Sequence, residues 1–164
     1  MVRADGAADH AGHGGAAPST SDIAFVDMPP GWHVTTGPAA IFYTPEQRAT
    51  GTYTLRSEIF QFDPGTRREG YGVLIGGRDL ADPTQAYTYF LIRRSGEFLV
   101  KRRTGATTST VKDWTATPAI RKFDDRAASE RSVKNVLEVR VTPQTTAFVV
   151  NGTVVASVPT TDVD

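Results

Sequence analysis

The stretch YTYFLIRRSGEFLVKRR, residues 87–103, decides the fold class of this chain. Two runs rich in β-branched and aromatic residues flank Ser95-Gly96, a pair typical of a tight turn, so the stretch predicts a β-hairpin. We expect a two-residue turn in which Arg94 faces Glu97, and this register assigns every side chain to a face. The expected core face carries Tyr87, Tyr89, Leu91, Phe98 and Val100, and the other face carries Thr88, Phe90, Ile92, Leu99, Lys101 and Arg103.

A second hairpin is expected around Asn151-Gly152, which lies between two β-branched runs. Asn and Gly both tolerate positive φ, so this pair is the strongest short hairpin signal. Asn151-Gly152-Thr153 also matches the N-glycosylation sequon. We favour the turn, because it alone explains both the Asn and the Gly.

Short β-rich runs separated by turn residues continue along the rest of the chain, which contains 22 Thr and 16 Val. This spacing is typical of an all-β sandwich, and the missing βα alternation excludes a doubly wound parallel sheet. Helix is expected only as one turn at Pro45–Ala49 and two turns at Asp124–Arg131. The remaining strands are predicted near Ala24–Met28, Trp32–Thr35, Ala40–Tyr43, Gly51–Asp63, Tyr71–Gly76, Thr108–Trp114, Asn135–Thr142, Thr145–Val150 and Thr153–Val158.

The first 22 residues differ in composition from the rest, because they contain no aromatic residue, no Ile and no Leu. Such a segment buries too little apolar surface to offset its ordering entropy. We therefore predict a flexible Gly/Ala/Ser-rich tail over 1–22 and one β-sandwich domain over 23–164. The tail lacks the apolar stretch of a signal peptide. We expect its His10 and His13 to be solvated rather than bound to a metal.

Charge and cysteine content exclude several classes of protein. The chain has 18 basic and 18 acidic residues, and no block of Lys and Arg that nucleic acid or an anionic membrane would require. Without cysteine there is no disulfide framework, no thiolate zinc site and no thiol nucleophile. No apolar run approaches the roughly 18 residues of a membrane span.

The hairpin residues 87–103, together with Asp113-Trp114, Asn135-Val-Leu-Glu-Val and Phe148-Val-Val-Asn-Gly, resemble the concanavalin A-like lectin/glucanase superfamily. The similarity extends from about Trp32 to Asp164 and is greatest to the laminin G-like and bacterial 3-keto-disaccharide hydrolase-like branches. The resemblance implies a two-sheet antiparallel jelly-roll sandwich with a concave sheet that binds ligands. It also implies a secreted or periplasmic location.

The chain departs from this family at its end. Domains of this kind usually continue after a segment like Val158–Asp164 into one or two further strands. A missing strand would leave a row of backbone donors and acceptors unpaired. We therefore expect Asp164 to lie beside an open sheet edge, or beside one paired with another chain in a homo-oligomer.

Catalytic carboxylates of the glucanase type are not found. A retaining glycosidase needs two carboxyl groups about 5 Å apart. Here Glu58 lies mid-strand and Asp63 follows five residues later, which predicts opposite faces and a separation of roughly 16 Å. We expect Glu58 to be the ion-pair partner of a neighbouring Arg, and Glu58 and Asp79 are the carboxylates that an enzyme would have to use. His33 has no Gly-x-Ser-x-Gly partner motif, so no serine triad is predicted.

Metal and phosphate sites are equally sparse. Asp79 and Asp82, with nearby carbonyl groups, offer the oxygen ligands that Ca²⁺ prefers, but Asp-x-x-Asp is also common in turns. The glycines of Gly70–Gly77 lie within a predicted strand and precede no helix, so they do not form a phosphate loop. No cofactor is predicted apart from this calcium alternative.

A ligand surface is the remaining possibility. Residues 67–103 carry eight basic and four acidic side chains, and Arg outnumbers Lys by 14 to 4 in the whole chain. Arginine suits planar recognition of polar groups, and aromatic rings suit stacking against a sugar. The leading hypothesis is a non-catalytic, lectin-like domain that binds carbohydrate or another polar ligand on its concave sheet. The alternatives are a 3-keto-disaccharide hydrolase-type enzyme and an assembly module. The expected ligand-binding residues are Tyr71, Arg78, Lys101, Arg103 and Trp114.

Overall fold

The computed structural model describes residues 2–4 and 19–163. Its chain divides into two compact units, residues 1–48 and 49–164, each of which is described by itself. Most of the predicted tail, 1–22, lies outside the described residues, including His10 and His13. Within that segment, Val2–Ala4 forms strand β1 and Thr20–Asp22 a short 3₁₀ turn, η1.

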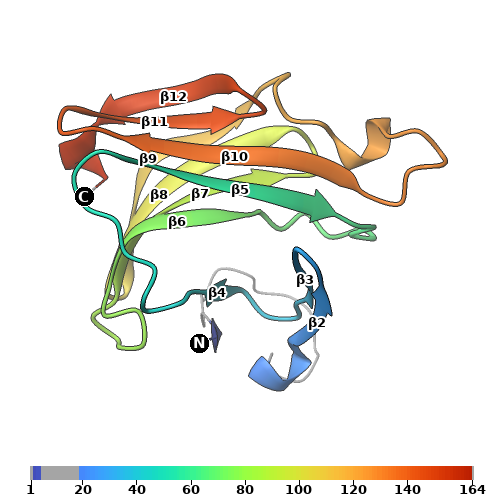
Figure 1. Cartoon of the computed structure of the whole chain (residues 1–164), viewed down its shortest axis with the longest axis horizontal. Helices are drawn as coiled ribbons and strands as arrows, with labels where there is room; N and C mark the ends of the chain where they lie inside the picture. Colours follow the sequence, from blue (N-terminus) through green and yellow to red (C-terminus); the bar gives the residue numbers. More distant parts are fainter. Residues whose placement is uncertain (1, 5–18, 164) are drawn as a thin grey trace. The chain divides into compact units, whose positions relative to one another are not determined.

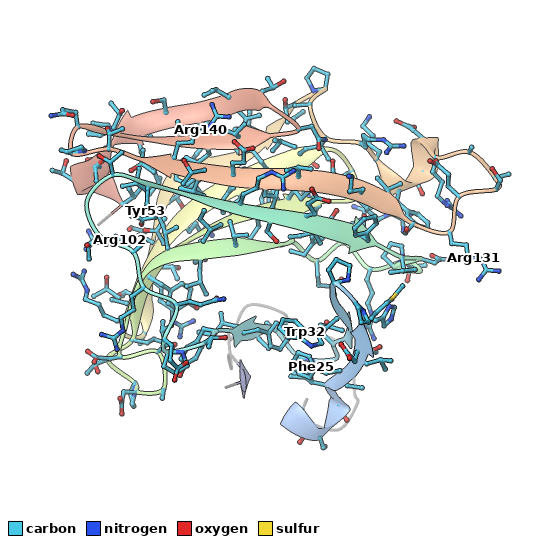
Figure 2. The ribbon with its side chains drawn as sticks, viewed as in Figure 1. Phe25, Trp32, Tyr53, Arg102, Arg131 and Arg140 are labelled. Atoms are coloured by element: carbon cyan, nitrogen blue, oxygen red, sulfur yellow. The ribbon has the colours of Figure 1, made fainter. Side chains whose placement is uncertain are left out.

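Among its described residues, the first unit contains two small antiparallel strand pairs. β1 pairs with β4 (Ala40–Phe42), and β2 (Ala24–Met28) pairs with β3 (Gly31–Thr35). The rings of Phe25 and Phe42 meet edge to face with centroids 5.2 Å apart. Phe25 and Trp32, both labelled in Figure 2, are nevertheless exposed.

The second unit is an antiparallel β-sandwich of two four-stranded sheets (Figure 1). We call the sheet of order β12-β11-β10-β5 the β10 sheet, and the sheet of order β6-β7-β8-β9 the β7 sheet. The β7 sheet is a meander of four consecutive strands. In the β10 sheet, β5 pairs with β10, and the four strands of the β7 sheet lie between these two in the sequence. The predicted all-β class with antiparallel sheets in a β-sandwich is confirmed. The strands are β5 (Tyr53–Gln61), β6 (Tyr71–Arg78), β7 (Ala86–Arg93), β8 (Glu97–Thr104), β9 (Thr107–Ala116), β10 (Val133–Val141), β11 (Thr145–Val150) and β12 (Thr153–Pro159).

The core lies between these sheets and is built from alternate residues of each strand. Phe90 of β7 and Phe148 of β11 meet across it with ring centroids 5.2 Å apart, and Phe98 of β8 packs against Phe90 at 6.2 Å. All three side chains are fully buried, as are Ile92 and Leu137. Burying each such side chain contributes about 1.5–3 kcal/mol, so these few rings hold the two sheets together.

The register expected for the 87–103 hairpin is wrong by one residue. Arg93, not Arg94, faces Glu97, so the loop contains three residues. Gly96 adopts φ = +86°, and its N–H donates to the Arg93 carbonyl over 3.0 Å. A three-residue loop that ends in a left-handed residue is among the next most common hairpin connections after the two-residue turn. The slip exchanges the faces of the first strand: Phe90, Ile92, Phe98 and Val100 lie in the core, and Tyr87, Tyr89, Leu91, Leu99, Lys101 and Arg103 lie on the opposite side.

The hairpin at Asn151-Gly152 is confirmed, with Val150 opposite Thr153 and φ values of +48° and +85° at the two turn residues. Both polar atoms of the Asn151 side chain also form hydrogen bonds. Its oxygen accepts the Val136 N–H at 2.8 Å, and its nitrogen donates at 2.8 Å to the Ala119 carbonyl and to Asn135 Oδ1. The sequon asparagine is thus a structural residue of the turn.

The C-terminal segment packs into the sandwich. β12 is the end strand of the β10 sheet, and it is followed by the 3₁₀ turn η3 (Thr160–Asp162). Val163 is only 3% exposed, and its carbonyl accepts a hydrogen bond of 2.7 Å from Thr88 Oγ1. The prediction made for Asp164 concerns a residue outside the described ones. None of the helices among the described residues is long and apolar enough to cross a membrane.

Candidate functional site

The outer face of the β7 sheet, the side away from the core, brings tyrosines and cations together in register. Tyr87 lies opposite Arg103, and Tyr89 lies opposite Lys101. We call these four residues the tyrosine–cation face. Its flanking positions are taken by Leu74 of β6, opposite Tyr89, and by Thr108 and Thr110 of β9, opposite Arg103 and Lys101.

The geometry of the tyrosine–cation face suits a flat polar ligand. The Tyr87 and Tyr89 rings are tilted by 49° with centroids 5.8 Å apart. Arg103 Nε donates to the Gly105 carbonyl at 2.9 Å, which orients the guanidinium group. Tyr89, Lys101 and Arg103 are half-buried, while Tyr87 is 5% exposed. Rings with polar tips beside cations can combine stacking with hydrogen bonding.

Trp114 belongs to a packed cluster at the other end of the same face. The Arg93 guanidinium lies 4.3 Å from the centre of the indole ring, and Arg93 also binds Glu97 through two contacts of 2.6 and 2.9 Å. These bonds from Arg93, and a further bond from Ser95, hold the pKa of Glu97 below its usual range. A Cβ placed on Gly70 would lie 3.0 Å from the indole, so this glycine permits the close approach. Trp114 thus anchors the loop before β6.

Two other predicted ligand residues lie elsewhere. Tyr71 of β6 packs against the core between the sheets, opposite Ile92, and its hydroxyl donates to Gln61 Oε1 over 3.4 Å. Burial raises the pKa of Tyr71 to about 12. Arg78 is exposed at the end of β6, beyond a bulge, opposite Ala86. Of the five predicted residues, the structure therefore groups Lys101 and Arg103, with Trp114 farther along the same face.

Sequence reasoning missed Tyr87 and Tyr89 as neighbours of Lys101 and Arg103. A two-residue turn assigns the tyrosines to the core face and the cations to the other face. The sequence feature that indicates the correct register is Gly96. Three-residue hairpin loops use a left-handed conformation at their third position, and glycine adopts it readily.

Glu58 lies on the outer face of the β10 sheet within a ladder of ion pairs. Its carboxylate contacts Arg56 at 2.7 Å and Lys134 at 3.4 Å, and these two bonds, Arg56 first, lower its pKa. The expected ion-pair role is confirmed. The ladder continues through Glu138, which binds Arg140 at 2.6 Å (Figure 2 labels Arg140 on this sheet). Asp79, in contrast, follows β6 of the other sheet, so the structure does not bring these two carboxylates to one site.

The loop after β6 uses its acidic residues in turns. Asp79 adopts φ = +50°, and its carbonyl accepts the Asp82 N–H at 2.8 Å. The Asp82 carbonyl in turn accepts the Gln85 N–H at 3.1 Å. Within residues 2–4 and 19–163, no group of three or more acidic or histidine side chains gathers as a metal site would require. His33 lies in β3 opposite Val26.

Comparison with family models, with curated proteins and with solved structures finds no match for this chain. The resemblance to concanavalin A-like domains therefore stays a prediction. The tyrosine–cation face brings aromatic rings and basic hydrogen-bond donors together on neighbouring strands.

Proposed function

We propose that this chain is a non-catalytic, lectin-like β-sandwich that binds a carbohydrate or another polar ligand on the outer face of the β7 sheet. The observation that carries the proposal is the register of the hairpin, which places Tyr89 beside Lys101 and Tyr87 beside Arg103. These residue types at neighbouring positions on one sheet match the two needs of sugar recognition, a flat apolar surface and charged hydrogen-bond donors.

The sheet provides a rigid platform for such a ligand. Both strands of the hairpin are paired on each side, β7 with β6 and β8 with β9. Side chains on central strands are held by their neighbours, so little conformational entropy is lost when a ligand binds. The packed cluster around Trp114 occupies one end of this face, and we place the ligand at the tyrosine–cation end.

The family resemblance agrees with this placement. A concanavalin A-like jelly roll binds its ligands on a concave sheet, and we propose that the β7 sheet is that sheet. The proposed ligand class also favours a secreted or periplasmic location for this chain, because a protein encounters polysaccharides there.

The proposal is tested with Tyr89→Ala and a panel of neutral and acidic oligosaccharides, using calorimetry on the full chain. Loss of the stacking ring is expected to weaken binding about tenfold or more, since one aromatic contact contributes roughly 0.5–1.5 kcal/mol beyond its buried area. Phe60→Ala is the matched control, because Phe60 is an aromatic residue 52% exposed on the β10 sheet. If the folded wild-type chain binds no member of the panel, the proposal fails.

A further inference from the structure

We propose that strand β5 is a pairing edge, through which two copies of this chain form a symmetric dimer and join their β10 sheets into one continuous sheet. The strand belongs to the β10 sheet, whereas the tyrosine–cation face belongs to the β7 sheet, so the inference is independent of the proposed function. It is carried by the regularity of this edge and by a strand sequence that is complementary to itself when two copies run antiparallel.

The edge formed by β5 differs from the other edges of the sandwich. β5 is the end strand of its sheet, and no strand among the described residues pairs with its free side (Figure 1). The other end strands, β6, β9 and β12, each contain at least one shift of register, and β12 ends at Pro159. Bulges and prolines protect a sheet edge against pairing. β5 has neither, because its nine residues, Tyr53–Gln61, pair with β10 without a shift.

The backbone groups of every second β5 residue point to this free side. Val136 of β10 directs both of its backbone groups toward β11: its N–H donates to Asn151 Oδ1 and its carbonyl accepts the Asn151 N–H, each over 2.8 Å. In an antiparallel ladder, the residue opposite such a position also turns its backbone groups away from the pair. Glu58 lies opposite Val136, so its N–H and carbonyl point to the free side, as do those of Arg56 and the other even-numbered residues of β5.

A two-fold axis at Ser57 gives a second β5 strand a complementary register. Antiparallel pairing about this axis sets Arg56 opposite Glu58 of the second copy, and Glu58 opposite its Arg56. Both residues turn their backbone groups to the free side, so they take the hydrogen-bonded positions of the new ladder, and their side chains share the outer face. A shift of two residues, the smallest that keeps every side chain on its face, would set Arg56 against Arg56 or Glu58 against Glu58. Charge therefore favours this one register.

The inner face of β5 benefits from the same register. Leu55 and Ile59 pack against the core but stay partly exposed. The residues opposite them on β10, Val139 and Asn135, are fully buried. Pairing about Ser57 sets Leu55 opposite Ile59 of the second copy, which removes apolar surface from water at the end of the sheet. Ser57 meets its own counterpart at a non-hydrogen-bonded position, where side chains approach most closely and a small residue fits.

The experiment measures the mass of the full chain by sedimentation velocity and light scattering. We expect a monomer–dimer equilibrium, in which the dimer fraction rises with protein concentration as mass action requires. A chain that stays monomeric from about 10 µM to about 1 mM would overturn the proposal.

Charge variants test the register. Arg56→Glu leaves acidic residues at both positions and Glu58→Arg leaves basic residues at both, so each variant alone sets like charges against each other twice in the dimer. We expect each to weaken dimerisation about tenfold or more. The double variant Arg56→Glu/Glu58→Arg exchanges the two charges and should restore the dimer. A mixture of the two single variants should also form dimers, because every acidic side chain at these positions then faces a basic one.

The matched control is Arg140→Glu, which reverses a charge on the outer face of the same sheet but lies on β10. It should leave dimerisation unchanged. Circular dichroism and thermal unfolding establish that each variant is folded. A dimer that both single variants leave intact, or that Arg140→Glu weakens equally, would show that β5 does not join the copies. Failure of the mixture to dimerise would overturn the proposed register and with it the proposal.

Discussion

At the scale of single residues, Asn151 connects three parts of the sandwich. Its side chain bonds the backbone of β10 at Val136, the Ala119 carbonyl in the loop after β9, and the buried Asn135. Asn135 in turn bonds both the N–H and the carbonyl of Arg121, at 2.9 and 3.0 Å. The two amides thereby fix a loop that has no strand partner of its own.

We predict that Asn151→Gly lowers the free energy of unfolding by about 1–3 kcal/mol, because buried polar groups lose their partners. Glycine accepts the φ of +48°, so this variant isolates the side-chain bonds from the turn conformation. Asn151→Ala should cost about 1 kcal/mol more, since alanine is strained in the left-handed region. Urea denaturation measures both. An Asn151→Gly variant as stable as the wild type would show that the network contributes nothing.

At the scale of elements, strand positions could be predicted from the sequence and one register could not. Alternation and turn residues locate a strand, because they depend only on local chemistry. Register depends on how the loop closes, and a slip of one residue moves a side chain to the other face. A two-residue turn therefore places Tyr87 and Tyr89 on the core face, away from Lys101 and Arg103, whereas the observed register places all four on one face. Tyr71 was misplaced for another reason: only the packing of two sheets shows that its ring lies inside.

We predict that Gly96→Ala destabilises the hairpin by about 1–2 kcal/mol, the usual cost of a left-handed conformation for a residue with a Cβ. The added Cβ would also lie 2.7 Å from Lys122 Cε, a flexible side-chain atom that can move aside. The control is Gly31→Ala, where nothing lies within 4 Å of the new Cβ. Thermal unfolding should show a lower midpoint for Gly96→Ala only. Equal midpoints for the two variants would contradict the three-residue loop.

At the scale of the whole molecule, the net charge is zero, but the outer faces of the two sheets carry different sets of side chains. On the outer face of the β10 sheet, Glu58 and Glu138 form ion pairs with Arg56, Lys134 and Arg140. On the outer face of the β7 sheet, Lys101 and Arg103 lie opposite tyrosines. What allows the two surfaces to differ is the core between them, which fixes each sheet independently of its outer side chains.

Phe148 of the β10 sheet meets Phe90 of the β7 sheet at 5.2 Å, and both are fully buried. Phe148→Ala should therefore destabilise the sandwich by about 3–5 kcal/mol, through lost burial and the cavity left behind. Because the contact joins the sheets, near-ultraviolet circular dichroism and fluorescence of Trp114 on the other sheet should report the same lowered transition. Phe60→Ala, an exposed aromatic on the same sheet, should change stability by less than about 0.5 kcal/mol. Separate transitions for the two probes would mean that the sheets unfold independently and that the shared core does not unite them.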